Sequence, residues 1–276
     1  LALVLLVAGL AASFFHLGRP ERAWRSAAQW RTSWLSREVI VLPAFMGVVA
    51  LYGGVLATGL NPVLATLPQG LPVDLAMVLG VLGTVLAFAL FVCTGMIYAC
   101  LRFLAEWHTA LTPINYILMG GASGFVLATA MAALAVPTLV GFLGGWALIL
   151  TALAAVGRIA SLWRNARLKP RSTPQTAIGI KHPRIVQRSA GFMAGSFNTR
   201  EFFHGKPMAW LKWTRHLAIG LGFVVPFMLL AAGRGEASAA LLMAAFAIQY
   251  LGLLAERWLF FAQARHPQNL YYQAVA

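Results

Sequence analysis

Long blocks of apolar residues constrain the fold of this chain more than any other feature of its sequence. A helix rises 1.5 Å per residue, so a run of about 20 apolar residues crosses the hydrocarbon of a bilayer. The blocks do not alternate apolar with polar residues, as the strands of a membrane barrel do. We therefore expect an all-α bundle of seven transmembrane helices, at residues 1–16, 38–60, 73–100, 113–135, 138–162, 214–233 and 237–262.

The amino-acid composition agrees with a membrane location. Of the 276 residues, 60% are hydrophobic and 10% are charged, whereas soluble domains contain about 25% charged residues. The chain begins at Leu1, inside an apolar block, with no Met and no charged segment ahead of it. Since a signal peptide starts with a positively charged region, we interpret residues 1–16 as a truncated helix and expect a further segment upstream.

The basic residues lie almost entirely on one side of the predicted bundle. If successive helices alternate in direction, 20 of the 21 Lys and Arg residues share one side, and Arg234 is the exception. Basic loops stay in the cytoplasm, so we expect this side to be cytoplasmic. The sequence thus predicts a single membrane domain, residues 1–276, in a bacterial inner membrane. Its C-terminus and its long basic loop, residues 163–212, are expected to be cytoplasmic.

Eight of the nine tryptophans also fall near the basic side, and Trp146 is the exception. A belt of interfacial aromatic residues is one interpretation, although such belts decorate both sides of a membrane. Trp and Arg are also enriched at protein interfaces. A docking surface for a partner protein is therefore the second interpretation, and no nucleic-acid partner is expected.

A short motif occurs twice in the chain. Residues 33–38 and 196–201 share the pattern S-aromatic-x-[ST]-R-E. Four predicted helices separate the two copies, so both would lie on the same side of the membrane. The motif suggests two parallel four-helix halves, the first of which lacks its first helix in this chain.

The histidines and cysteines argue against a bound haem or metal. Membrane cytochromes hold haem b between paired histidines inside their spans, but all six histidines here lie at helix ends or in loops on the basic side. Cys93 and Cys100 are seven residues apart and lack the spacing of metal ligands. We therefore expect no haem, no iron–sulfur cluster and no other metal in this chain.

His16 and Glu38 are the first candidates for chemistry. His16 ends the first predicted helix and Glu38 begins the second, so both should lie at the same depth on the basic side. A quinone ring would enter from the lipid, and its carbonyls need hydrogen-bond donors and protons. Histidine titrates near neutral pH and can supply both. Each residue also has an interpretation without a functional role. His16 could simply cap its helix, and the Glu38 carboxylate could be stabilised by the dipole of the helix that it begins.

Glu256 is a further candidate because it lies within the last turns of the final predicted helix. A carboxylate near the hydrocarbon is costly unless it is paired, and it indicates function by default. An ion pair with an arginine of a neighbouring helix is the alternative.

Two stretches resemble the membrane anchor subunit of dimethyl sulfoxide reductase-type molybdoenzymes. Residues 16–23 read H-L-G-R-P-E-R-A, similar to the family pattern H-L-G-x-P-x-R-A, which is followed by a Ser and a Glu as at 33–38. Residues 256–261 look like the family ending G-E-x-x-G-R-x-F-Y, with Ala255 in place of its first Gly. The resemblance covers the whole chain in layout, but it is specific mainly at residues 13–38.

The resemblance implies eight helices, a first helix absent from this chain, and no haem. It implies an iron–sulfur subunit with [4Fe–4S] clusters, docked on the basic face, and a molybdopterin catalytic subunit. It also implies a site for ubiquinone or menaquinone near that face, with His16 and Glu38 as proton relay. The residues assigned to this quinone site are His16, Arg19, Ser36, Glu38, Tyr98, Arg102 and His108. Structural or secondary roles are assigned to Arg22, Arg37, Glu256 and Arg257.

Two branches of that family are compatible with the chain, and substrate catalysis lies in another subunit in both. Residues 196–205 and 266–272 look more like the anchor of quinone-linked sulfite dehydrogenases, which would pass electrons from cytoplasmic sulfite oxidation to quinone. The anchor of a reductase that oxidises menaquinol is the alternative. A small transporter is a second alternative, although the predicted helices offer few ionisable residues near the midplane.

Overall fold

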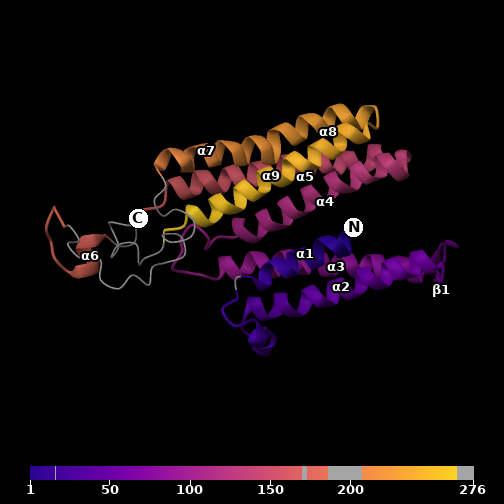
Figure 1. The fold of residues 1–276 in the computed structure, drawn as a ribbon, viewed down its shortest axis with the longest axis horizontal. Coiled ribbons are helices and arrows are strands. Elements are labelled where there is room, and N and C mark those ends of the chain that lie inside the picture. The colour runs from indigo at the N-terminus through magenta and orange to yellow at the C-terminus, as the bar shows by residue number, and fades with distance from the viewer. Residues whose placement is uncertain (16, 170–172, 186–206, 266–276) are drawn as a thin grey trace. The chain divides into compact units, whose positions relative to one another are not determined.

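The computed structural model describes residues 1–15, 17–169, 173–185 and 207–265. The chain divides into two compact units, Leu1–Ile97 and Tyr98–Ala276, both built mainly from long helices (Figure 1).

Leaving aside residue 16, the first unit consists of three helices, a 3-10 helix and a small ribbon. In chain order they are α1 (Ala2–Phe14), η1 (Pro20–Gln29), α2 (Trp34–Thr58), β1 (Val63–Thr66), β2 (Pro72–Asp74) and α3 (Leu75–Ala99). α2 begins after Ser33, whose side-chain oxygen accepts a hydrogen bond from the backbone nitrogen of Ser36. It ends at Gly59, which adopts a left-handed conformation with φ of 69°. Both are common signals of helix ends.

The ribbon at the turn between α2 and α3 was not predicted from the sequence. β1 and β2 pair antiparallel, with Val63 opposite Asp74. The side chain of Asn61 accepts a hydrogen bond from the backbone nitrogen of Ala76 at 2.9 Å and donates one to Asp74 at 2.8 Å. The first of these bonds satisfies a backbone N–H at the start of α3. Apart from this ribbon, the predicted all-α class is confirmed over the described residues.

Within its described residues, the second unit contains four long helical segments and one short helix. In chain order they are α4 (Leu111–Ala135), η2 (Pro137–Leu139), α5 (Val140–Ala166), α6 (Pro174–Ile178), α7 (Met208–Ile219), the π-helix η4 (Gly220–Val224), α8 (Val225–Gly235) and α9 (Ala239–Ala262). Buried residues of α4, α5, α8 and α9 form its main core, among them Val126, Ala147, Leu230 and Leu242.

A close approach of two backbones determines how α9 packs in this unit. A methyl group placed on Gly252 of α9 would overlap the backbone of Gly222 in η4. Only glycine therefore fits at Gly252, and small residues at such crossings are typical of membrane helix packing. The crossing coincides with the π-helix, whose widened turn directly precedes Pro226. Pro226 has no backbone N–H to donate, so a change in the hydrogen-bond ladder is expected next to it.

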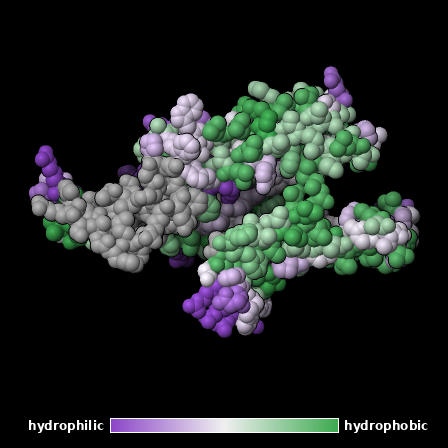
Figure 2. Space-filling view, viewed as in Figure 1, coloured by the Kyte–Doolittle hydropathy of each residue, from purple (hydrophilic) through white to green (hydrophobic). Residues whose placement is uncertain are grey.

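Six of the seven predicted membrane helices are confirmed as helices long and apolar enough to cross a bilayer. They are α2, α3, α4, η2 with α5, α7 to α8, and α9. Residues 1–16 contain the apolar helix α1, which at 13 residues is shorter than the length that spans the hydrocarbon. Figure 2 shows hydrophobic side chains along the flanks of the long helices and a hydrophilic patch over η1.

The long basic loop is shorter than its predicted bounds of 163–212. α5 continues to Ala166 and α7 already begins at Met208, so both helices extend into the predicted loop. Part of the remaining loop, and with it the second copy of the repeated motif, lies outside the described residues.

The Gly252 crossing makes a testable prediction about stability. We expect Gly252→Ala to destabilise the protein by about 1–3 kcal/mol, because the added methyl group forces helices apart in a packed interior. Gly222→Ala is the matched control, since its methyl group would meet the Gly252 backbone at 3.6 Å, an ordinary contact. The measurement is the thermal unfolding midpoint of each purified variant in detergent. Equal midpoints for the two variants would contradict the geometry.

Candidate functional site

The segment that leads into α2 is tied to that helix by the polar side chains of the repeated motif. Ser36 is buried, and its hydroxyl donates a hydrogen bond to the backbone oxygen of Ser26 in η1. Arg37 donates from Nε to the Trp30 oxygen at 2.9 Å and from Nη2 to the Arg31 oxygen at 2.8 Å. Ser36, which was assigned to the quinone site, therefore connects η1 to α2. The two bonds of Arg37 fit the structural role predicted for that residue.

Glu38 lies one turn inside α2, because the helix begins at Trp34. The prediction that Glu38 begins the helix is therefore wrong by about one turn, and a dipole effect weakens beyond the first turn. Its carboxyl Oε1 lies 2.5 Å from the Thr94 hydroxyl of α3. Among the described residues, no lysine, arginine or histidine forms an ion pair with it. In the part of the chain that the structure describes, the half-buried carboxyl group of Glu38 thus has no cation that would neutralise it.

The other assigned residues of the first unit cluster around η1. Arg19 precedes η1 and is exposed, and Arg22 is exposed with its Nε 3.9 Å from Glu21 Oε1. His16 lies outside the described residues, so its predicted position beside Glu38 stays a prediction.

Three further residues assigned to the quinone site belong to the second unit, which begins at Tyr98 in the last turn of α3. His108 Nδ1 lies 2.6 Å from the backbone oxygen of Ala99. Tyr98 packs edge to face on Trp107 and on Phe260, with ring centroids 5.1 and 5.2 Å apart. Arg102 is exposed. Their assignment to the same site as Glu38 stays a prediction.

Glu256 forms the centre of a buried ion-pair cluster in the second unit. One carboxylate oxygen lies 2.8 Å from Nε of Arg158 in α5, and the other lies 2.6 Å from Nη2 of Arg257. Glu256 is 0% exposed and Arg158 is 4% exposed. The interpretation of Glu256 as the partner of an arginine on a neighbouring helix is confirmed. Arg158 itself was not singled out from the sequence, although an arginine inside an apolar block was a signal for it.

Aromatic rings cover Arg257 on its other side. Its guanidinium carbon lies 4.3 Å from the centre of the Tyr116 ring and 4.8 Å from that of Phe260. Trp107 stacks on Phe260 and donates from its indole nitrogen to the Phe260 backbone oxygen at 3.0 Å. Cation–π contacts of this kind gain strength where water is excluded. The cluster therefore fixes the end of α9 against α4 and α5, as expected for a structural role of Glu256 and Arg257.

Smaller polar contacts join the same helices. The Asn115 amide donates to the Ser161 hydroxyl at 2.8 Å, and Gln249 donates to the Thr151 hydroxyl at 3.4 Å. All four side chains are buried. Interhelical bonds of this type hold membrane helices together.

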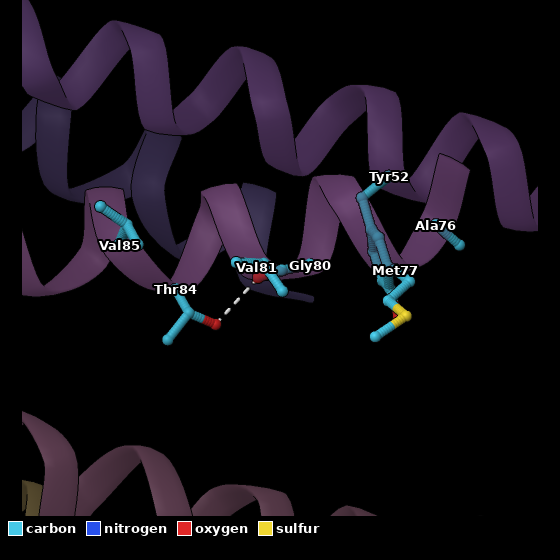
Figure 3. A pocket seen from close by; sticks show the side chains of 7 residues that line it. All are labelled: Tyr52, Ala76, Met77, Gly80, Val81, Thr84 and Val85. Atoms are coloured by element: carbon cyan, nitrogen blue, oxygen red, sulfur yellow. Dashed lines mark hydrogen bonds between the residues drawn. The ribbon is translucent and has the colours of Figure 1, made fainter. Parts of the chain in front are cut away.

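The first unit carries an open hollow (Figure 3). It is lined by Tyr52, Ala76, Met77, Gly80, Val81, Thr84 and Val85. Tyr52 is fourteen residues after Glu38 on α2, which corresponds to about 21 Å along the helix. The Thr84 hydroxyl donates to its own helix, to the Gly80 oxygen at 2.8 Å. The side chains that line the hollow are mainly apolar, so the hollow suits contacts with lipid rather than proton transfer.

Metal ligands do not gather in the part of the chain that the structure describes. No three His, Cys, Asp or Glu residues come together there, and neither Cys93 nor Cys100 forms a disulfide. The expectation that this chain holds no metal stays a prediction.

The buried cluster predicts a large effect of neutralising Glu256. We expect Glu256→Gln to destabilise the protein by about 3–5 kcal/mol, because two arginines would lose their shared anion in a low-dielectric interior. Glu21→Gln is the control, since its exposed pair with Arg22 is worth at most about 1 kcal/mol. Thermal unfolding in detergent measures both. A Glu256→Gln variant as stable as the parent protein would contradict the structural role.

Comparison with known proteins places this architecture in a family. Residues 1–262 match the family model described as DMSO reductase anchor subunit (DmsC). The C subunit of the sulfite dehydrogenase of Allochromatium vinosum is 56% identical over 275 residues, which cover 100% of this chain and 85% of that protein. The matched range, residues 1–262, extends over both units. The chain therefore belongs to the DMSO reductase anchor subunit family.

Proposed function

We propose that this chain is the haem-free, quinone-reactive anchor of a membrane-bound molybdoenzyme complex. It would pass electrons from an iron–sulfur subunit to the quinone pool, in a complex that oxidises sulfite in the cytoplasm. The observation that carries the proposal is Glu38, a half-buried carboxyl group at the basic end of α2 that Thr94 holds without a neutralising cation among the described residues. Family membership and the similarity to a sulfite dehydrogenase subunit support the context.

Quinone chemistry suits a carboxyl group in this position. Reduction of a quinone to a quinol takes two electrons and two protons, and a general acid must lie within hydrogen-bond reach of the oxygen that is protonated. A carboxyl group near the hydrocarbon can carry a proton between the aqueous side and a ring that enters from lipid. In the proposal, His16 donates a hydrogen bond and a proton to the quinone, and Glu38 supplies protons to it from the cytoplasm.

The remaining residues assigned to the quinone site have different roles in the proposal. Arg19 belongs to the exposed approach beside η1, whereas Ser36 shapes the site by fixing η1 to α2. Tyr98, Arg102 and His108 would line the other side of the quinone. The choice between ubiquinone and menaquinone is left open.

The basic side of the protein would receive the iron–sulfur subunit. Three arginines of the first unit lie over tryptophan rings there: Arg25 over Trp24 at 5.5 Å, Arg31 over Trp30 at 5.4 Å and Arg37 over Trp34 at 4.2 Å. Trp24 and Trp30 are more than half exposed. Exposed Trp–Arg pairs next to a redox site support docking of a protein partner. The [4Fe–4S] clusters and the molybdopterin would belong to partner subunits.

The proposal also includes a defined topology. The chain would form one membrane domain in the bacterial inner membrane, with the basic loops and the C-terminus in the cytoplasm. We propose seven spans, with α1 as part of the first, out of eight in two parallel halves. The positive charge of η1 and of the long loop supports this orientation.

A reductase anchor is the second candidate function, because the family description itself names DMSO reductase. In that case, the same site would oxidise menaquinol, and protons would leave through Glu38 rather than enter. The name of the relative from Allochromatium vinosum favours the sulfite branch.

Replacing His16 tests the proposed quinone site. We expect His16→Leu in the whole complex to reduce quinone-coupled sulfite oxidation at least about a hundredfold, the usual contribution of a positioned acid. Sulfite oxidation with an artificial acceptor should stay unchanged, since the catalytic subunit is untouched. His182→Leu, at an exposed position after α6, is the matched control. Unchanged quinone reduction by His16→Leu would overturn the assignment.

Cysteine labelling tests the proposed topology. In a chain whose Cys93 and Cys100 are replaced by Ser, we expect Thr32→Cys to react with a membrane-impermeant maleimide in inside-out vesicles only. Glu236→Cys, between α8 and α9, should react in right-side-out vesicles only. Both positions are exposed. The reverse pattern would place the basic side outside the cytoplasm.

A further inference from the structure

The Thr94 hydroxyl faces two oxygen atoms at once. It lies 2.5 Å from Glu38 Oε1 and 2.9 Å from the backbone oxygen of Leu90, one turn earlier in α3. A hydroxyl group carries one proton to donate and can also accept hydrogen bonds. A backbone oxygen can only accept. Thr94 therefore cannot donate to Leu90 and to Glu38 at the same time.

This proton count gives the pair of side chains two complete arrangements. When the Glu38 carboxyl group carries a proton, it donates to Thr94 Oγ1, and Thr94 donates to Leu90. When Glu38 has lost its proton, Thr94 turns its own proton from Leu90 to the Glu38 carboxylate. Neither arrangement requires Glu38 to move, and Thr94 keeps its own proton in both.

Among the described residues, Thr94 is the hydrogen-bond partner of Glu38, and no charged side chain takes its place. Arg37 is next in sequence, but its Nε and Nη2 are engaged with Trp30 and Arg31. α1 carries no charged side chain, and the buried thiol of Cys93 on α3 lies close enough to Glu38 to interact with it electrostatically. The charged residues of η1 are Glu21, Arg22 and Arg25, and all three are exposed.

We propose that Thr94 is a positioning residue for proton transfer, and that its rotating hydroxyl holds Glu38 in one place while Glu38 gains and loses a proton. The inference rests on the proposed quinone function and adds a residue to it. During quinone reduction, the proton that leaves Glu38 ends on the quinol, through His16. A proton from the cytoplasm replaces it, and the partner subunit supplies the electrons. Thr94 undergoes no net chemical change.

Removal of the hydroxyl at nearly constant volume tests this role in the complete complex. Thr94→Val should lower the kcat of quinone reduction about ten- to hundredfold, the cost of losing a hydrogen bond to a charged group. KM for quinone should change little. Thr94→Ser should restore the rate, because it retains the hydroxyl. The pH profile of kcat should shift in Thr94→Val and return to that of the parent in Thr94→Ser.

Thr84→Val is the matched control on the same helix. Thr84 makes the same bond to the backbone oxygen four residues earlier, at 2.8 Å, but no carboxylate of the described residues bonds to it. If the loss in Thr94→Val came from the helix bond alone, Thr84→Val would show it too. We expect Thr84→Val to behave as the parent protein, and an equal loss in both variants would overturn the proposal.

Infrared difference spectra supply a readout that stability does not affect. The carboxyl band of Glu38, identified by its absence in Glu38→Gln, should shift in Thr94→Val and recover in Thr94→Ser. If Thr94→Val does not assemble, Thr94→Ala and Thr94→Ser provide the same comparison. A Glu38 band that is identical in all assembled variants would overturn the proposal.

Glu38→Gln separates this inference from the proposed function. If Glu38→Gln reduces quinone at the rate of the parent complex, neither Glu38 nor Thr94 takes part in the mechanism. Loss of quinone reduction in Glu38→Gln together with a fully active Thr94→Val would leave the quinone site standing and overturn only the role of Thr94.

Discussion

Water is absent from the hydrocarbon of a bilayer, so every polar group placed there must find its partner inside the protein. Long helices satisfy the backbone by themselves, but each polar side chain among them needs a specific neighbour. In the second unit, Glu256 finds Arg158 on another helix and Arg257 on its own. In the first unit, Glu38 finds the hydroxyl of Thr94. The arrangement of the helices around these side chains follows from that requirement.

The two carboxyl groups illustrate how the partner decides the role. Glu256 is fully buried between two arginines, so moving a proton onto it would break a buried ion-pair network. Glu38 has a hydroxyl partner that can accept as well as donate, and this partner accommodates either protonation state. The first arrangement suits a fixed connection between helices, and the second suits a group that exchanges protons. This difference supports the proposal of proton chemistry at Glu38 and a structural role at Glu256.

Much of the fold could be predicted because hydropathy acts locally along the chain. Six of the predicted spans agree with the helices, and the largest difference is at Met208, where the helix begins six residues before the predicted start at 214. The ribbon at Val63–Thr66 and Pro72–Asp74 escaped prediction because short strands in a connecting loop have no comparable signal. The start of α2 was placed too late because Trp34 and Ser36 were read as loop, whereas Ser33 caps the helix. Arg158 was counted as a topological charge and turned out to hold Glu256.

The sequence by itself determined that the chain folds into long apolar helices and that Glu38 and Glu256 lie within or beside apolar segments, because both follow from the transfer of single residues between water and lipid. Only the tertiary structure decided which helices bring their polar groups together. Thr94 is 56 residues from Glu38 in the chain, and Arg158 lies on a different helix from Glu256, so their pairing depends on how the helices rotate and pack. Spacing along one helix cannot specify the rotation of another, because side-chain packing between helices sets it.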